Sequence, residues 1–197
     1  MLHTRCVITA VGLTAMLAGC GGGSPSPAGS EQVSTTPPAT GGATVLADLT
    51  KDWTDQKDTM LKAADAMPDD KFGYKSTPAQ RSYGEQVMHI ALVNVDLLKV
   101  VGGSLGGNVT PPSFTAESVK TKADMLKALG DSYDYGLALL RERTDATITS
   151  TIDAAFLGPS TRGRVFWVLL AHSMDVYGQM VVYLRLNGVV PPASRGL

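Results

Sequence analysis

The stretch from Thr161 to Asn187 places the strongest constraint on how this chain folds. It has the pattern of one long helix that is apolar on almost every side. Gly188 follows it, and Pro191 and Pro192 come soon after, which is a common way for a helix to end. A helix with so little polar surface is expected to lie in the middle of a helical bundle.

Apolar residues recur at helical spacing in three further segments, approximately 44–66, 83–101 and 115–143. Segment 144–160 carries alternating Thr and Ile, but it is too short and solitary to build a sheet, so we interpret it as a loop with a helical turn. Four helices with apolar stripes and no convincing strand predict an all-α fold. The expected architecture is a four-helix bundle, in which sites are built from facing helices.

The N-terminus has the features of an export signal. A basic start at Arg5 precedes an apolar run that is too short to span a membrane as a mature helix, so residues 1–19 are predicted to be a signal peptide. The next residue is Cys20, and Leu17-Ala18-Gly19-Cys20 resembles the lipobox of bacterial lipoproteins, which are cut before the cysteine that carries the lipid. The alternative is ordinary secretory cleavage near Gly19, which would leave a free thiol.

Residues 20–43 are rich in Gly, Ser, Thr and Pro and cannot bury enough apolar surface to fold, so we expect a disordered tether. The folded domain is predicted to span residues 44–197. Acyl chains on Cys20 would attach it to a membrane without a spanning segment, which predicts an extracytoplasmic location in the cell envelope. Gly21, and not Asp, follows the cysteine, which suggests the outer membrane if the host has two membranes.

The formal net charge of −1 at pH 7 gives no electrostatic reason to expect a nucleic-acid partner. Of the two cysteines, Cys6 lies in the predicted signal peptide and Cys20 is the predicted lipid carrier. The mature chain is therefore expected to have neither a disulfide nor a thiol nucleophile.

His89 and His172 are the two histidines of the predicted mature chain, and each lies near the middle of a predicted helix. Two imidazoles at similar depth on adjacent helices can share a divalent ion, because neutral imidazole is a good ligand for zinc, nickel, iron or copper. The alternative is two unrelated core histidines, each satisfied by a hydrogen bond.

The stretches SYGEQVMHIALVN at 82–94 and TRGRVFWVLLAHSMDVYGQMVVYLRLNGVVPPASR at 161–195, with the segment 52–82 before them, resemble the DinB-like family. The resemblance runs from about residue 46 to 195. It implies a four-helix bundle, often dimeric, with a metal held by three histidines: one on the second helix and two spaced H-x-x-x-H on the fourth. Some members are metal-dependent transferases that act on small thiols, others resemble hydrolases or isomerases, and many have no known activity.

Carried over by position, His89 matches the first ligand of this family and His172 the second, whereas the third position is Val176. Asp175 is a candidate substitute ligand, since two histidines and one carboxylate form a legitimate metal site, but it is equally consistent with a surface residue. We therefore expect a divalent metal of the zinc, nickel or iron type to bind weakly or not at all.

Together these features predict a lipid-anchored binding module without robust catalysis, and a homodimer is a further expectation from the resemblance. The loss of one ligand at Val176 favours a module, as does export, because small thiol cofactors are mainly cytoplasmic. The alternative is a metal-dependent transferase or hydrolase that acts on a small molecule.

Overall fold

A computed structural model of the protein describes residues 43–103, 109–115 and 117–195. The predicted signal peptide 1–19, the predicted lipidation site Cys20 and nearly all of the predicted tether 20–43 lie outside these residues. The helices all belong to one compact unit, Thr40–Leu197.

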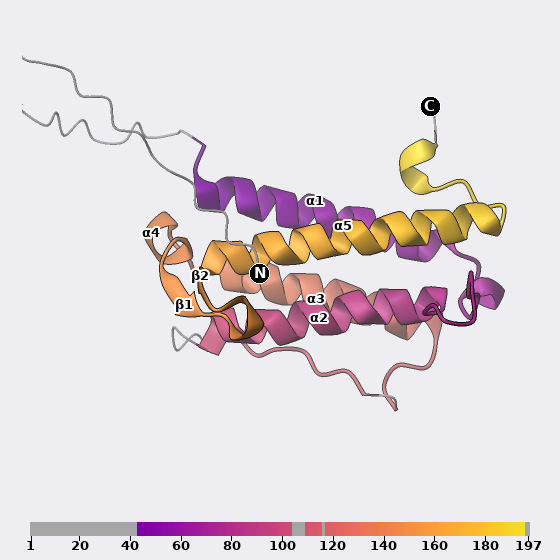
Figure 1. Ribbon diagram of the computed structural model, residues 1–197, viewed down its shortest axis with the longest axis horizontal. Helices are drawn as coiled ribbons and strands as arrows, with labels where there is room; N and C mark the ends of the chain where they lie inside the picture. Colours follow the sequence, from indigo (N-terminus) through magenta and orange to yellow (C-terminus); the bar gives the residue numbers. More distant parts are fainter. Residues whose placement is uncertain (1–42, 104–108, 116, 196–197) are drawn as a thin grey trace, which may run out of the picture. The chain divides into compact units, whose positions relative to one another are not determined.

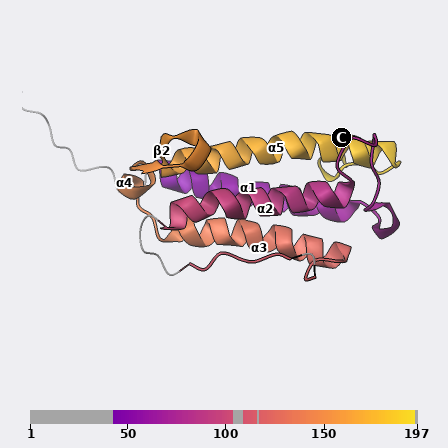
Figure 2. The ribbon, with the colours of Figure 1, turned by 60° about the horizontal axis from the view of Figure 1, so that its bottom comes forward.

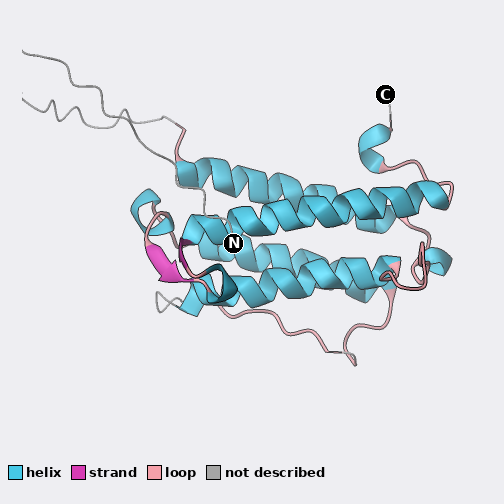
Figure 3. Ribbon diagram, viewed as in Figure 1, coloured by secondary structure: helices cyan, strands magenta, loops and turns pink. Residues whose placement is uncertain are grey.

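Four long helices form a bundle, which confirms the predicted all-α class (Figures 1 and 3). They are α1 Val45–Ala66, α2 Tyr83–Gly103, α3 Lys122–Arg141 and α5 Arg162–Leu186. The shorter elements are η1 Asp69–Lys71, α4 Asp145–Ile148, β1 Thr151–Asp153, η2 Ala155–Leu157, β2 Pro159–Thr161 and η3 Pro192–Ser194.

The helix starts agree with the capping residues in the sequence. The Ser82 amide donates to Glu85 Oε2 at 2.5 Å, and the Glu85 amide donates to Ser82 Oγ at 3.2 Å, which is the reciprocal pair of a capping box at the start of α2. Thr44 caps α1 and Thr161 caps α5 through their side-chain oxygens. These caps fix where α2 and α5 begin. They therefore also fix how far along the bundle each residue of these helices lies.

The four helices pack in the ring order α1, α3, α2, α5, so that α2 lies beside α5. Figures 1 and 2 show that α1 and α5 run in one direction and that α2 and α3 run in the other. Because α2 and α3 are parallel, the chain between them must return along the length of the bundle. This return explains why α3 begins at Lys122, after a capping box at Thr121, and not near residue 115 as predicted.

Segment 144–160 corrects the sequence interpretation. The expected helical turn is present as α4, but a two-stranded antiparallel hairpin follows, in which Thr151 pairs with Thr161. Gly158 adopts a φ of 64° in the connection, a conformation that glycine reaches without steric cost. Ile152 is buried, so the short hairpin is stabilised by packing against the end of the bundle and needs no larger sheet.

The apolar helix α5 is not the centre of the bundle, which is a second correction. It buries one face, whereas Trp167, Met174 and Val182 on other faces are 53%, 49% and 50% exposed. The apolar composition of this helix therefore predicted more burial than the structure shows. The core instead lies between the four helices, and Trp53 is one of its largest fully buried side chains.

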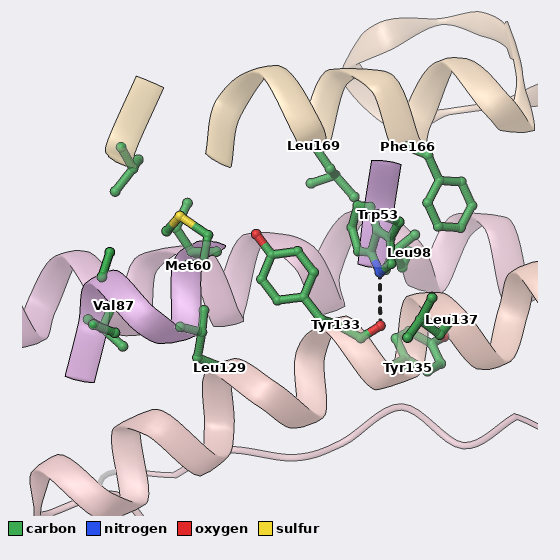
Figure 4. Close-up of a cluster of buried hydrophobic side chains, with 14 of the residues drawn as sticks. Trp53, Met60, Val87, Leu98, Leu129, Tyr133, Tyr135, Leu137, Phe166 and Leu169 are labelled. Atoms are coloured by element: carbon green, nitrogen blue, oxygen red, sulfur yellow. Dashed lines mark hydrogen bonds between the residues drawn. The ribbon is translucent and has the colours of Figure 1, made fainter. Parts of the chain in front are cut away.

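The indole of Trp53 is fully buried and packs against the rings of Tyr133 and Phe166, at centroid distances of 5.0 and 5.1 Å (Figure 4). Its Nε1 donates to the main-chain oxygen of Tyr133 at 2.9 Å. Gly136, which follows Tyr133 by almost one turn of α3, allows this close approach, because a Cβ there would lie 2.6 Å from the indole. Glycine lowers helix propensity, so its presence inside α3 is explained by packing.

Replacing Gly136 with Ala should lower the free energy of unfolding by about 1–3 kcal/mol, because the buried indole has no room to move aside. The matched control is Gly130→Ala on the same helix, where the nearest heavy atom to a new Cβ would be 4.0 Å away. This variant should gain about 0.5–1 kcal/mol from helix propensity. Urea unfolding followed by circular dichroism measures both values, and equal effects at the two glycines would contradict the packing argument.

Candidate metal centre

His89 and His172 meet between α2 and α5. His172 lies near the middle of α5, whereas His89 lies in the second turn of α2, and the two Nε2 atoms are 3.1 Å apart. The ring centroids are 4.9 Å apart and the ring planes are nearly perpendicular, at 84°. Both residues are partly buried. At this separation one ring donates through its Nε2 proton and the other accepts through an Nε2 lone pair.

This spacing also fits two ligands of one metal ion. Bonds of about 2.0–2.1 Å from zinc to imidazole nitrogen, at angles of roughly 90–110°, place the two nitrogens roughly 2.8–3.4 Å apart. The observed 3.1 Å lies within this interval. The pair therefore has the separation of two metal ligands without any movement of the helices.

The surroundings favour neutral imidazoles. Burial is the main cause that lowers the pKa of His89, and the charges of Arg81 and His172 lower it further. Burial also lowers the pKa of His172, where Asp175 partly opposes the effect and Arg81 adds to it. Since neutral imidazole is the form that binds metals, both rings are in the appropriate state at neutral pH.

The third ligand position of the resemblance does not hold a metal ligand. Val176 is buried, with 2% of its surface exposed. Asp175, the candidate substitute, accepts a hydrogen bond from Gln179 Nε2 at 3.1 Å, and Gln179 Oε1 accepts one from Gln86 at 2.8 Å. Within the part of the chain that the structure describes, no group of three or more His, Cys, Asp or Glu side chains could hold a metal ion. The residues present thus fit two ligands and not three.

Two pockets open beside the histidines, and His89 lines both. One has a volume of about 360 Å³ and lies between α2, α5 and η2, with both imidazoles and Phe156 in its wall. The other has a volume of about 490 Å³ and is lined by α2 and the loop before it, including Arg81. Both volumes fall in the range of about 300–1,000 Å³ that is typical of small-molecule sites.

Other polar residues considered from the sequence have structural roles. Ser173 is buried and accepts a hydrogen bond from the Tyr133 hydroxyl at 2.8 Å, so it is not a nucleophile. Arg164 donates to the main-chain oxygen of Leu157 at 3.2 Å, and Arg162 is buried at the hairpin end of α5. Neither arginine lines the two pockets beside the histidines.

Arg81 and Phe156 are the site residues that sequence reasoning missed. Arg81 directly precedes the Ser82 cap and lies about two turns before His89. Once the start of α2 was known, this spacing could have indicated that Arg81 lies near the histidine. Phe156 lies in the turn between β1 and β2, so it could not be placed while that segment was interpreted as a loop. Its side chain is 77% exposed, although it is aromatic.

The fold and the paired histidines define a four-helix bundle with an interhelical imidazole site. The sequence profile of the DinB superfamily matches residues 52–180, which include both histidines. The chain belongs to this superfamily, as the resemblance predicted.

Two solved structures share the fold. A DinB-like protein from Bacillus cereus has a TM-score of 0.62 and 19% identity, over 73% of this chain and 93% of that one. A DinB-like protein from Bacillus subtilis has a TM-score of 0.58 and 21% identity, over 76% of this chain and 99% of that one. At these identities the likeness establishes the fold alone. No curated protein matches the chain.

Proposed function

We propose that this protein is a lipid-anchored DinB-like binding module of the cell envelope, with a divalent-metal site that has lost one ligand. The observation that supports it is the pair of Nε2 atoms 3.1 Å apart, together with an aliphatic residue, Val176, in the third position. His89 and His172 would hold the ion. A bound ion would act there as a Lewis acid toward a ligand group.

Two imidazoles bind a divalent ion less tightly than three, and the remaining positions are left to water or a ligand. The chain's own contribution is to hold the rings at the correct separation and to keep them neutral. The Gln86–Gln179–Asp175 hydrogen bonds lie beside the pair and fix the α2–α5 interface around it. These features support reversible binding more than robust turnover.

A second candidate function is a metal-dependent transferase or hydrolase that acts on a small molecule. It is favoured by the pocket of about 360 Å³ that opens directly onto both imidazoles. An enzyme of this kind would retain stoichiometric metal through purification and would lose it in a His172→Ala variant. A binding module would keep its full melting temperature in the presence of a chelator.

Replacing Val176 with His should tighten zinc binding by at least about tenfold, since even the loss of an outer-shell partner changes metal affinity by about 10–100-fold. Position 176 lies one helical turn after His172 and shares its face. Isothermal titration of the metal-free protein with zinc measures the change. His172→Ala should abolish zinc binding at this site.

The matched control is Val182→His, which places a new imidazole on the same helix at a residue that is 50% exposed. This variant should leave the affinity unchanged. Circular dichroism checks that the buried Val176→His substitution preserves the fold. If folded Val176→His protein binds zinc no more tightly than the parent, the proposed metal site is wrong.

The membrane attachment rests on Cys20 and the signal peptide before it. In cells that process lipoproteins, Cys20→Ser should abolish labelling by radioactive palmitate and move the protein out of the membrane fraction. Cys6→Ser is the control, because that cysteine lies in the predicted signal peptide and should not carry the lipid. Palmitate labelling that persists in Cys20→Ser would contradict the lipid anchor.

A further inference from the structure

The two pockets beside the imidazole pair follow one another along α2. Glu85 and Leu92 line the first, Val93 and Leu97 line the second, and His89 belongs to both walls. With a rise of 1.5 Å per residue, the stretch from Glu85 to Leu97 spans about 18 Å. One extended ligand can therefore contact both pockets while it passes the imidazoles.

The first pocket is cationic. Arg81 and Lys75 line it together with one carboxylate, Glu85, which pairs with Lys75 at 3.2 Å. Among the described residues no carboxylate pairs with the Arg81 side chain. Its backbone is held in place, because the Tyr183 hydroxyl donates to the Arg81 oxygen at 2.9 Å. Arg81 therefore projects from a main chain that is held in place, and its exposed guanidinium is available to an anionic group.

The second pocket is mostly apolar. Val93, Leu97, Val168 and Phe156 line it around the two imidazoles. Its one carboxylate belongs to Asp96, which pairs with Lys99 at 3.1 Å. An exposed phenylalanine at the rim of an apolar pocket leaves hydrocarbon surface that a ligand could cover.

We infer that this site binds a soluble, single-chain amphipathic carboxylate, with its anionic group near Arg81 and its hydrocarbon chain in the apolar pocket. The inference deepens the proposed function, because it names the ligand class of the same binding module, and it requires no bound metal. A cationic head group would face Arg81 with like charge. A neutral chain would gain no attraction from the exposed Arg81 charge.

The test uses the predicted mature chain, residues 20–197 with Cys20→Ser so that no detergent is needed, in EDTA. Isothermal titration compares decanoate with hexanoate, decanol and decyltrimethylammonium. Each fully buried methylene tightens binding by about fourfold, so decanoate should bind at least about tenfold more tightly than hexanoate. It should also bind more tightly than decanol and the cationic amphiphile.

Two variants with matched controls locate the ligand. Arg81→Gln should weaken decanoate binding by about three- to fivefold and leave decanol unchanged, whereas Arg185→Gln, an exposed arginine outside both pockets, should have no effect. Phe156→Ser should weaken decanoate binding by about threefold or more, and Met174→Ser, at an exposed residue outside both pockets, should not.

Absence of decanoate binding, or equal losses in the control variants, would overturn the inference. Binding to phosphatidylglycerol vesicles without binding of soluble decanoate would overturn it too, because the ligand would then be a membrane lipid.

A parallel zinc titration separates the ligand inference from the proposed metal site. Zinc binding without decanoate binding would refute this inference alone, and decanoate binding without zinc binding would refute the metal site alone.

Discussion

The packing of α2 against α5 is the constraint on which the rest of this molecule depends. Side-chain contacts across that interface join Tyr183 with the main chain of Arg81, Gln179 with Gln86, and His172 with His89. Residue numbers rise along α2 as they fall along α5, which is the alignment of two antiparallel helices. The same register that joins the helices therefore sets the separation of the imidazoles and holds Arg81 beside them.

Position 176, where the family resemblance implies a metal ligand, holds an aliphatic residue in this chain. Val176 contributes to the hydrophobic core, so the bundle gains packing where the family resemblance implies a metal ligand. His89 and His172 keep the separation of a metal-binding pair. Under the proposed function such a site would bind its ligand reversibly, and the cationic and apolar pockets on either side would determine which ligand it selects.

Much of this arrangement could be predicted from sequence, because apolar periodicity shows which face of a helix is buried and Ser82 with Glu85 marks where α2 begins. The convergence of His89 and His172 was expected from their places on two apolar helices, although His89 lies closer to the start of α2 than predicted. Periodicity does not show which helices are neighbours or in which direction they run, so the return between α2 and α3 was missed. The hairpin was missed because its stability comes from the contact of Ile152 with the bundle, a tertiary effect.

The most direct test of the account is a pH titration of the imidazole nitrogens by ¹⁵N NMR on metal-free protein, residues 20–197. His89 and His172 are the two histidines in that chain. The account predicts coupled titration below the ordinary value of about 6.5, with one Nε2 protonated and one bare at neutral pH, and a changed His89 curve in His172→Ala. Two independent titrations at the ordinary value, with His89 unaffected by His172→Ala, would contradict it.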